Sequence, residues 1–167
     1  MYSVHSPQSL AIRPLLNLLL PSNCVLCKDR LSESNYCLCK GCNEALPQLT
    51  NQCSGCGTPM LNGITSPDIS CSECQRKPPP FARCIAALHY MSPVDRLITR
   101  IKSDPHAPEL QELSSLLLAS IYARYDTNSI PTTIIPVPLH WRKLAYRGFN
   151  QSYNIAKYLN QQLPNTQ

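Results

Sequence analysis

Glycine is scarce in this sequence, which has 5 glycines and 16 prolines among its 167 residues. Few flexible positions and many rigid ones predict short helices joined by stiff connections. Gly148 is the only glycine after residue 63, and two acidic residues are nowhere adjacent. The C-terminal half therefore offers no site made from an acidic pair next to a glycine loop. A chain of this length holds one ordinary domain, or a small metal module with a partial second domain.

The sequence also lacks an apolar run long enough to cross a membrane. The leucine-rich stretch Leu15–Leu20 is interrupted by Asn17, and no small-residue cleavage site follows it before Cys24. We therefore predict a short amphipathic helix within residues 1–22, which either packs on the neighbouring module or docks on a membrane or a partner. The lack of a targeting signal predicts a cytoplasmic protein, in which thiols stay reduced.

Acidic residues are absent after Asp126, so the tail from Thr127 to Gln167 carries only cationic charge. Basic side chains are interleaved there with aromatic ones. This mixture suits single-stranded nucleic acid, because phosphates meet cations and bases stack on rings. The alternative is a solvated basic face whose aromatic side chains turn into the core.

Cysteine, in contrast, is abundant, and eight of the 10 cysteines form four Cys-x-x-Cys pairs. Each pair presents two thiolates to one ion, so four pairs make two closed structural zinc sites. A disulfide framework is the rival interpretation, which the paired spacing and the missing secretion signal disfavour. Two loaded sites would lower the formal net charge of +5 to about +1, because zinc with four thiolates carries about −2. The predicted ligands are Cys24, Cys27, Cys39, Cys42, Cys53, Cys56, Cys71 and Cys74.

The four pairs can share two ions in two ways. Sequential pairing joins the first pair with the second and the third with the fourth, and it closes the shortest loops. Interleaved pairing would give a crossed double site. Cys37 is an alternative to Cys39 as a ligand, Cys84 is expected to be a small buried apolar side chain, and Gly57 suits a turn that needs a positive φ after the ligand Cys56. Such a module is either purely structural or also contacts nucleic acid or protein.

The segment Lys77–Pro80, which ends in three consecutive prolines, is predicted to be a stiff hinge between the cysteine-rich part and the rest of the chain. Two apolar runs, Cys84–Leu88 and Thr132–Val137, are predicted to be buried strands. Helices with one apolar face would normally cover a sheet, and two strands offer them little surface. We therefore expect residues 81–167 alone to be marginally stable, dimeric or prone to aggregate. The helices are expected from a capping box at Ser92 and Asp95 to Asp104, from about Pro108 to Tyr125, and from the N-cap Asn150 through Leu163.

The stretch from Ile134 to Leu159 combines a strand, a basic loop and a helix. Free amides and the positive end of a helix dipole would face the loop, basic side chains add formal charge, and Gly148 lets the backbone turn, which together make a phosphate-binding arrangement. No nucleophile and base stand together, so we predict binding and no catalytic residue. The candidate phosphate- or nucleic-acid-binding residues are His140, Arg142, Lys143, Arg147, Gly148, Asn150 and Gln151.

The same stretch closely resembles the hallmark of the ComF family of competence-associated proteins, the ComFC/GntX-like group. Its Val-Pro-Leu-His and Arg-Gly-Phe-Asn-Gln motifs stand here at residues 137–140 and 147–151. The resemblance covers nearly the whole chain and implies an α/β fold class, with an N-terminal double zinc ribbon followed by the N-terminal part of a type I phosphoribosyltransferase-like α/β domain. It implies this division: an N-terminal helix at 1–22, a double zinc ribbon at 23–76, the hinge at 77–80 and an incomplete phosphoribosyltransferase-like domain at 81–167.

The resemblance further implies that the protein binds single-stranded DNA during uptake and natural transformation, alongside other competence proteins. A domain of this kind is expected to carry an acidic pair and a Thr-Gly loop after the hallmark, and both are absent here, so we expect a truncated chain that binds without catalysing. One alternative is a phosphoribosyltransferase-family enzyme whose C-terminal half is supplied separately and brings the site for magnesium and phosphoribosyl pyrophosphate. Another is a structural or vestigial zinc-ribbon protein.

Overall fold

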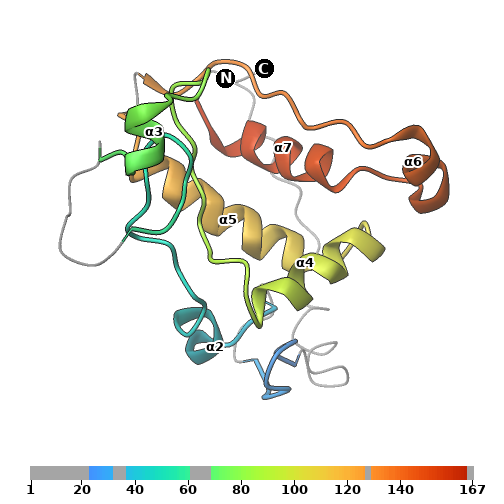
Figure 1. Cartoon of the computed structure of the whole chain (residues 1–167). Helices are drawn as coiled ribbons and strands as arrows, with labels where there is room; N and C mark the ends of the chain where they lie inside the picture. Colours follow the sequence, from blue (N-terminus) through green and yellow to red (C-terminus); the bar gives the residue numbers. More distant parts are fainter. Residues whose placement is uncertain (1–22, 32–36, 61–68, 127–128, 165–167) are drawn as a thin grey trace, which may run out of the picture. The chain divides into compact units, whose positions relative to one another are not determined.

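The computed structural model of the chain describes residues 23–31, 37–60, 69–126 and 129–164 (Figure 1). The helix predicted within residues 1–22 lies outside them. The chain divides into two units, Met1–Ala45 and Leu46–Gln167. The first half of the predicted double ribbon thus belongs to one unit, and the second half belongs to the same unit as the helices that follow it. The predicted hinge at 77–80 lies inside the second unit.

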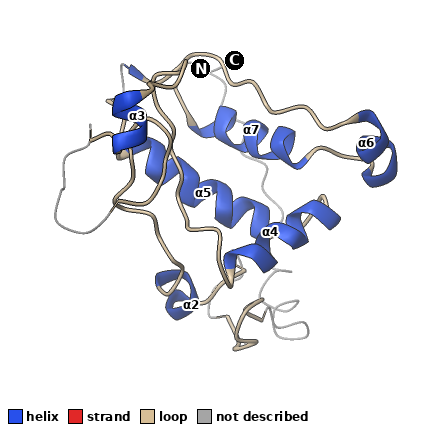
Figure 2. Cartoon of the chain, in the orientation of Figure 1, coloured by secondary structure: helices blue, strands red, loops and turns tan. Residues whose placement is uncertain are grey.

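The described residues form six helices and no named strand (Figure 2). The first unit contributes one short helix, and the second contributes the other five. The helices are α2 (Lys40–Glu44), α3 (Ser72–Arg76), α4 (Val94–Ser103), α5 (Glu109–Tyr122), α6 (Trp141–Arg147) and α7 (Gln151–Gln162).

The three longer helices lie where hydrophobic periodicity predicted helices, although the buried residues of α5 are Glu109, Glu112 and Ser114. In α4 the side chains of Val94, Leu97 and Ile101 are buried on one face, as their spacing requires. In α7 the predicted N-cap is also confirmed, because Asn150 Oδ1 accepts a hydrogen bond from the amide of Ser152 at 3.0 Å.

The predicted capping box at the start of α4 was wrong. Pro93 is the N-cap of α4, and its ring cannot accept a hydrogen bond from the first turn. The carboxylate of Asp95 instead accepts a hydrogen bond from the amide of Arg96 at 2.8 Å. The capping box fails because the chain enters the helix one residue later than Ser92.

Both strand predictions were wrong for the described residues. The run Cys84–Leu88 pairs with a neighbour only through an isolated antiparallel bridge between Gln48 and Leu88. Thr132–Val137 has no regular secondary structure, and the side chains of Ile135 and Val137 are 83% and 73% exposed. A strand needs a second backbone at hydrogen-bonding distance. No described segment pairs with Thr132–Val137 in a β-ladder.

The predicted basic loop is partly helical. Residues Trp141–Arg147 form α6, in keeping with the good helix propensities of arginine, lysine, leucine and alanine. His140 caps the helix, since its Nδ1 atom accepts a hydrogen bond from the amide of Arg142 at 3.3 Å. Gly148 ends α6 in the left-handed conformation with φ of 77°, and its amide donates to Leu144 O at 2.8 Å. The turn predicted at Gly148 is confirmed.

The core of the second unit lies between α5 and α7, which are neighbours in Figure 1. Tyr122 Oη donates a hydrogen bond to Gln162 O at 3.1 Å and ties the ends of the two helices together. The helices therefore bury their apolar faces against each other where a sheet had been expected. The buried centre consists of Ile130, Leu159 and Leu163, surrounded by Leu117, Leu118, Ile121, Tyr125, Ile134, Ile155 and Tyr158.

Two acidic side chains are buried at the start of α5, where α4 and α5 pack together. Glu109 is fully buried and forms an ion pair with Arg100 of α4, whose side chain is 55% exposed. Glu112, one turn further along, is also buried, and this burial raises the pKa of its carboxyl group.

Candidate metal centres and basic surface

The eight predicted cysteines gather in two groups of four. In each group all four Sγ atoms lie within 4.8 Å of one another. The Sγ atoms of Cys27 and Cys39 are 3.6 Å apart, and those of Cys56 and Cys71 are 3.8 Å apart. A tetrahedral zinc ion with Zn–S bonds of about 2.3 Å requires S–S separations of about 3.8 Å. The groups are Cys24, Cys27, Cys39 and Cys42, and Cys53, Cys56, Cys71 and Cys74.

These groups confirm sequential pairing and the choice of Cys39 over Cys37. The interleaved alternative is wrong, because each group combines two pairs that are consecutive in the sequence. The disulfide alternative is wrong as well, since no disulfide joins any two of these eight cysteines and four Sγ atoms gather in each group. Four thiolates with no open position make a structural site, and the two groups are accordingly the two structural zinc sites of the protein.

Backbone amides point at the sulfur atoms and stabilise their thiolate forms. Burial would raise the pKa of the Cys24 thiol, but amide hydrogen bonds from Cys27 and Cys39 lower it to about 6. In the second site the pKa of Cys53 is likewise lowered to about 6, against the effect of burial, by the amides of Cys56 and Cys71. The pKa of Cys74 is instead raised to about 12 by burial and by hydrogen bonds to neighbouring thiols, so the amides favour the thiolate form at some of the ligands and not at all four.

We call the first Cys-x-x-Cys pair of each zinc site its knuckle: Cys24–Cys27 in the first site and Cys53–Cys56 in the second. The residue that follows each knuckle has a positive φ. Gly57 has φ of 75°, which confirms the turn predicted after Cys56. A side chain at Gly57 would also meet the sulfur of Cys84 at 3.0 Å. Lys28 occupies the matching position in the first site with φ of 69°. The second knuckle is thus packed against a neighbour and needs glycine, whereas the first accommodates lysine.

The candidate nucleic-acid residues lie on α6, at the turn after it and at the start of α7. The side chains of His140, Arg142 and Lys143 are exposed, and that of Arg147 is partly buried. Asn150 and Gln151 are half-buried, and Gln151 Oε1 has no hydrogen-bond partner among the described residues. The structure therefore brings the basic members to one exposed helix and uses the polar members to start the next.

Asn150 connects the two motifs of the hallmark. Its Oδ1 atom caps α7, and its Nδ2 atom donates a hydrogen bond to Val137 O at 3.0 Å. One amide side chain therefore binds the segment before α6 to the helix after it. This role is positional, and it explains an asparagine at this place without direct contact to a ligand.

Three exposed aromatic side chains accompany these basic residues on α6 and α7, although they were not among the candidate site residues. Trp141 is 68% exposed and Tyr146 is 92% exposed, and Tyr153 of α7 is exposed too. The guanidinium of Arg142 lies over the Trp141 ring, 5.2 Å from its centroid. The interleaving of basic and aromatic residues in the sequence was the signal that could have added them. We call Trp141, Arg142, Lys143, Tyr146, Arg147, Tyr153 and Lys157 the basic–aromatic surface.

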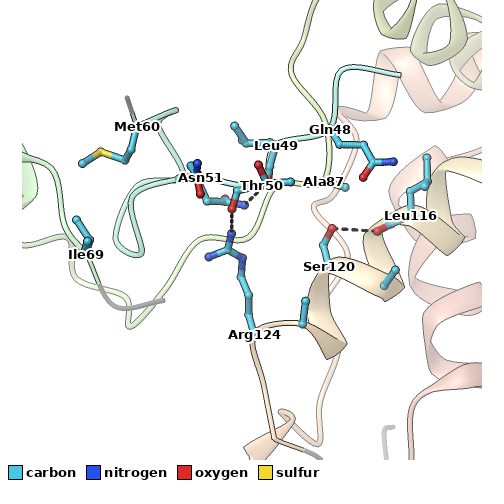
Figure 3. Close-up of a pocket in the computed structure, with 13 residues that line it drawn as sticks. Gln48, Leu49, Thr50, Asn51, Met60, Ile69, Ala87, Leu116, Ser120 and Arg124 are labelled. Carbon is cyan, nitrogen blue, oxygen red and sulfur yellow. Dashed lines mark hydrogen bonds between the residues drawn. The ribbon is translucent and has the colours of Figure 1, made fainter. Parts of the chain in front are cut away.

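A cavity of about 430 Å³ lies in the second unit between the second ribbon and α5 (Figure 3). Arg124 reaches across it and donates a hydrogen bond to Thr50 O at 2.9 Å, and Ser120 donates to Leu116 O within α5. Most of the remaining wall is apolar, and no candidate site residue lines it. The cavity was not predicted, because its walls come from segments that are far apart in the sequence.

The chain is similar in sequence to a known domain family and to several curated proteins. A sequence model of the double zinc ribbon domain matches residues 15–75. The DNA utilization protein YhgH of Salmonella typhimurium is 34% identical over 141 residues, covering 81% of this chain and 59% of the relative. YhgH of Escherichia coli K12 is 34% identical over 137 residues with the same coverage. Competence protein F of Haemophilus influenzae is 28% identical over 142 residues, covering 84% of this chain and 58% of the relative.

The chain thus spans less than two thirds of the length of the curated relatives it matches. No solved structure matches it. None of the described helices combines the length and the apolarity that a membrane crossing requires.

Proposed function

Because the chain belongs to the ComF family of proteins with a double zinc ribbon, we propose that it acts in DNA uptake and binds single-stranded DNA through the basic–aromatic surface. The names of the relatives, DNA utilization protein and Competence protein F, support the uptake role. The proposed setting is the cytoplasm, where thiols stay available for zinc, and other competence proteins are the proposed further partners.

The exposed pair of Trp141 and Arg142 is the observation that carries the proposal. An indole ring with a guanidinium on its face offers a stacking platform for a base and a cation for the adjacent phosphate. Tyr146 is more exposed still and lies on the same short helix. No acidic residue follows Asp126 to repel phosphates. The candidates Lys143 and Arg147 would add phosphate contacts that are independent of sequence.

Fluorescence anisotropy with a labelled oligothymidylate tests this proposal. Trp141→Ala should weaken binding by about 5- to 150-fold, because stacking is worth about 1–3 kcal/mol per base. Arg142→Ala should lower the slope of log affinity against log salt by about 0.7, the value for one lost phosphate contact on a single strand. Trp141 is the single tryptophan, so quenching of its fluorescence on titration would report contact at this site directly.

Tyr90→Ala and Arg96→Ala are matched controls, since both side chains are exposed and lie in or beside α4, outside the proposed surface. Both should bind like the unsubstituted protein. Unchanged affinity and salt slope in Trp141→Ala and Arg142→Ala would overturn the proposal and favour a purely structural zinc-ribbon protein. A preference for duplex over the single strand would contradict the stacking argument.

We further propose that the second unit is the opening part of a phosphoribosyltransferase-like α/β domain. The run Thr132–Val137 supports this, because Ile135 and Val137 expose apolar side chains that a neighbouring strand would cover. Sites for magnesium and phosphoribosyl pyrophosphate would require residues beyond the matched part of the relatives.

Hydrogen exchange checks the proposed strand. The amides of Ile135 and Val137 should exchange rapidly in this chain, since no described backbone group accepts from them. When the C-terminal portion of YhgH is fused after Pro164, both should become at least about tenfold slower, as for amides in a sheet ladder. The amide of Leu163, which already donates to Leu159 O at 2.8 Å, serves as the internal control. Equal exchange in both proteins would rule out strand pairing here.

A further inference from the structure

We infer that the two zinc sites have different roles: the second supports the helices of the C-terminal unit, and the first folds as a separate module. The inference starts from the division of the chain between Ala45 and Leu46, which puts the second group of four cysteines in the same unit as α4, α5 and α7. The contacts that join this group to the helices run through three sets of hydrogen bonds.

The first set joins the second knuckle to the segment 84–89. The amide of Cys84 donates to the carbonyl of Ser54, the residue after the ligand Cys53, at 3.0 Å. Gln52, the residue before that ligand, is 5% exposed, and its side chain forms two hydrogen bonds with the backbone of Ala86. Its Nε2 atom donates to Ala86 O at 2.8 Å, and its Oε1 atom accepts from Ala86 N at 3.0 Å.

The second set continues along the same segment. The amide of Leu49 donates to Ala87 O at 2.9 Å, and the amide of His89 donates to Pro47 O at 2.9 Å. The segment 84–89 is therefore bonded along its length to the chain that enters the second zinc site. It leads within a few residues to Val94, the start of α4.

The third set reaches the end of α5. The Arg124 guanidinium donates to Thr50 O at 2.9 Å across the cavity (Figure 3). Arg83 donates to the carbonyl of Arg124, and its guanidinium lies over the Tyr125 ring, 5.1 Å from the centroid. Tyr125 in turn packs against the core between α5 and α7. Contacts therefore lead without a gap from the second knuckle to the hydrophobic core.

The first site has a different environment. Its backbone hydrogen bonds link residues of the first unit, such as Val25 N to Cys37 O at 2.9 Å and Cys24 N to Asp29 O at 2.8 Å. Zinc binding to an unformed site is itself folding free energy, so each ion stabilises the structure that is built on its ligands. Loss of the first ion should destabilise the first unit alone. Loss of the second should destabilise residues 46–54 and, through the contacts described above, helices α5 and α7.

Two paired-cysteine variants of the full chain test this difference. Cys24→Ser/Cys27→Ser and Cys53→Ser/Cys56→Ser should each retain one zinc ion by native mass spectrometry. Hydrogen exchange should show protected amides in α5 and α7 of the first-site variant and at least about a hundredfold loss of protection there in the second-site variant. Equal loss in both, loss only in the first-site variant, or retained protection in both would overturn the inference.

A third variant separates the contact from the ion. Gln52→Ala keeps all eight thiols but removes the two side-chain bonds to Ala86. It should retain two zinc ions and still show faster exchange in α5 and α7, whereas the neighbouring substitution Asn51→Ala should change neither. Unchanged exchange in Gln52→Ala would contradict the proposed route from the second knuckle to the helices. None of these measurements depends on DNA binding, so the proposed function can fail while this inference stands.

Discussion

Replacement of Arg100 by methionine should lower the free energy of unfolding of the second unit by about 3–5 kcal/mol at pH 7. Glu109 is fully buried, and Arg100 forms an ion pair with it from α4. Without this cation the carboxylate must stay charged and unpaired or take up a proton. Removing one partner of a buried ion pair typically costs about 3–5 kcal/mol, because the charge that is left has no partner to offset its lost hydration. Urea unfolding followed by far-UV circular dichroism, with zinc present, measures the change.

The double substitution Arg100→Met/Glu109→Gln should recover more than half of this loss, because no buried charge remains to be neutralised. Arg96→Met, an exposed position on the same helix, should change stability by less than about 0.5 kcal/mol. A loss below about 1 kcal/mol at pH 7 would show that the buried carboxylate does not depend on this pair.

Glu112, on the same helix, should have the opposite effect on stability: its charged carboxylate lowers the free energy of unfolding. Burial raises the pKa of its carboxyl group above the unfolded value, so its contribution to stability is fully present below the unfolded pKa and is lost as the pH rises through the folded pKa. At pH 7 the group therefore opposes folding. Glu112→Gln should raise the unfolding free energy at pH 7 and lose that advantage in acid, which separates it from the pair at Glu109.

Leu159→Ala should lower the free energy of unfolding of the second unit by about 2–5 kcal/mol. Leu159 is 7% exposed and lies in the centre of the core between α5 and α7, together with Ile130 and Leu163. Truncation removes apolar surface and leaves a cavity that two short helices cannot close by small shifts. Because α7 begins at the turn that follows α6, the loss should also raise hydrogen exchange at the Asn150 cap.

The matched control is Gln161→Ala, two residues further along α7 on the exposed side. It should change stability by less than about 0.5 kcal/mol, since it removes no buried surface and alanine favours helix. Both variants keep all zinc ligands, so their zinc content should remain two ions. A Leu159→Ala protein as stable as its control would mean that α7 is not held by this core.

The zinc sites and the longer helices could be predicted from the sequence because their determinants are local. Two cysteines separated by two residues place their thiols together in one turn whatever surrounds them. The spacing of Val94, Leu97 and Ile101 marks one helical face. Asn150 caps the helix that starts beside it. Each of these patterns needs only a few neighbouring residues to take effect, and sequential pairing followed from the short loops between the cysteine pairs.

Other features were decided by tertiary structure, because they need partners that are distant in the sequence. Thr132–Val137 has the composition of a strand, yet an extended backbone becomes a strand only beside another one. From the sequence, Glu109 would be expected to lie exposed on its helix. The packing of α4 on α5 instead buries it beside Arg100. Gln52 carries no sequence signal for its bonds to Ala86, which attach the second knuckle to the helical unit. The sequence by itself thus determined the zinc ligands and the three longer helices, and long-range hydrogen bonds and burial decided which zinc site belongs with those helices.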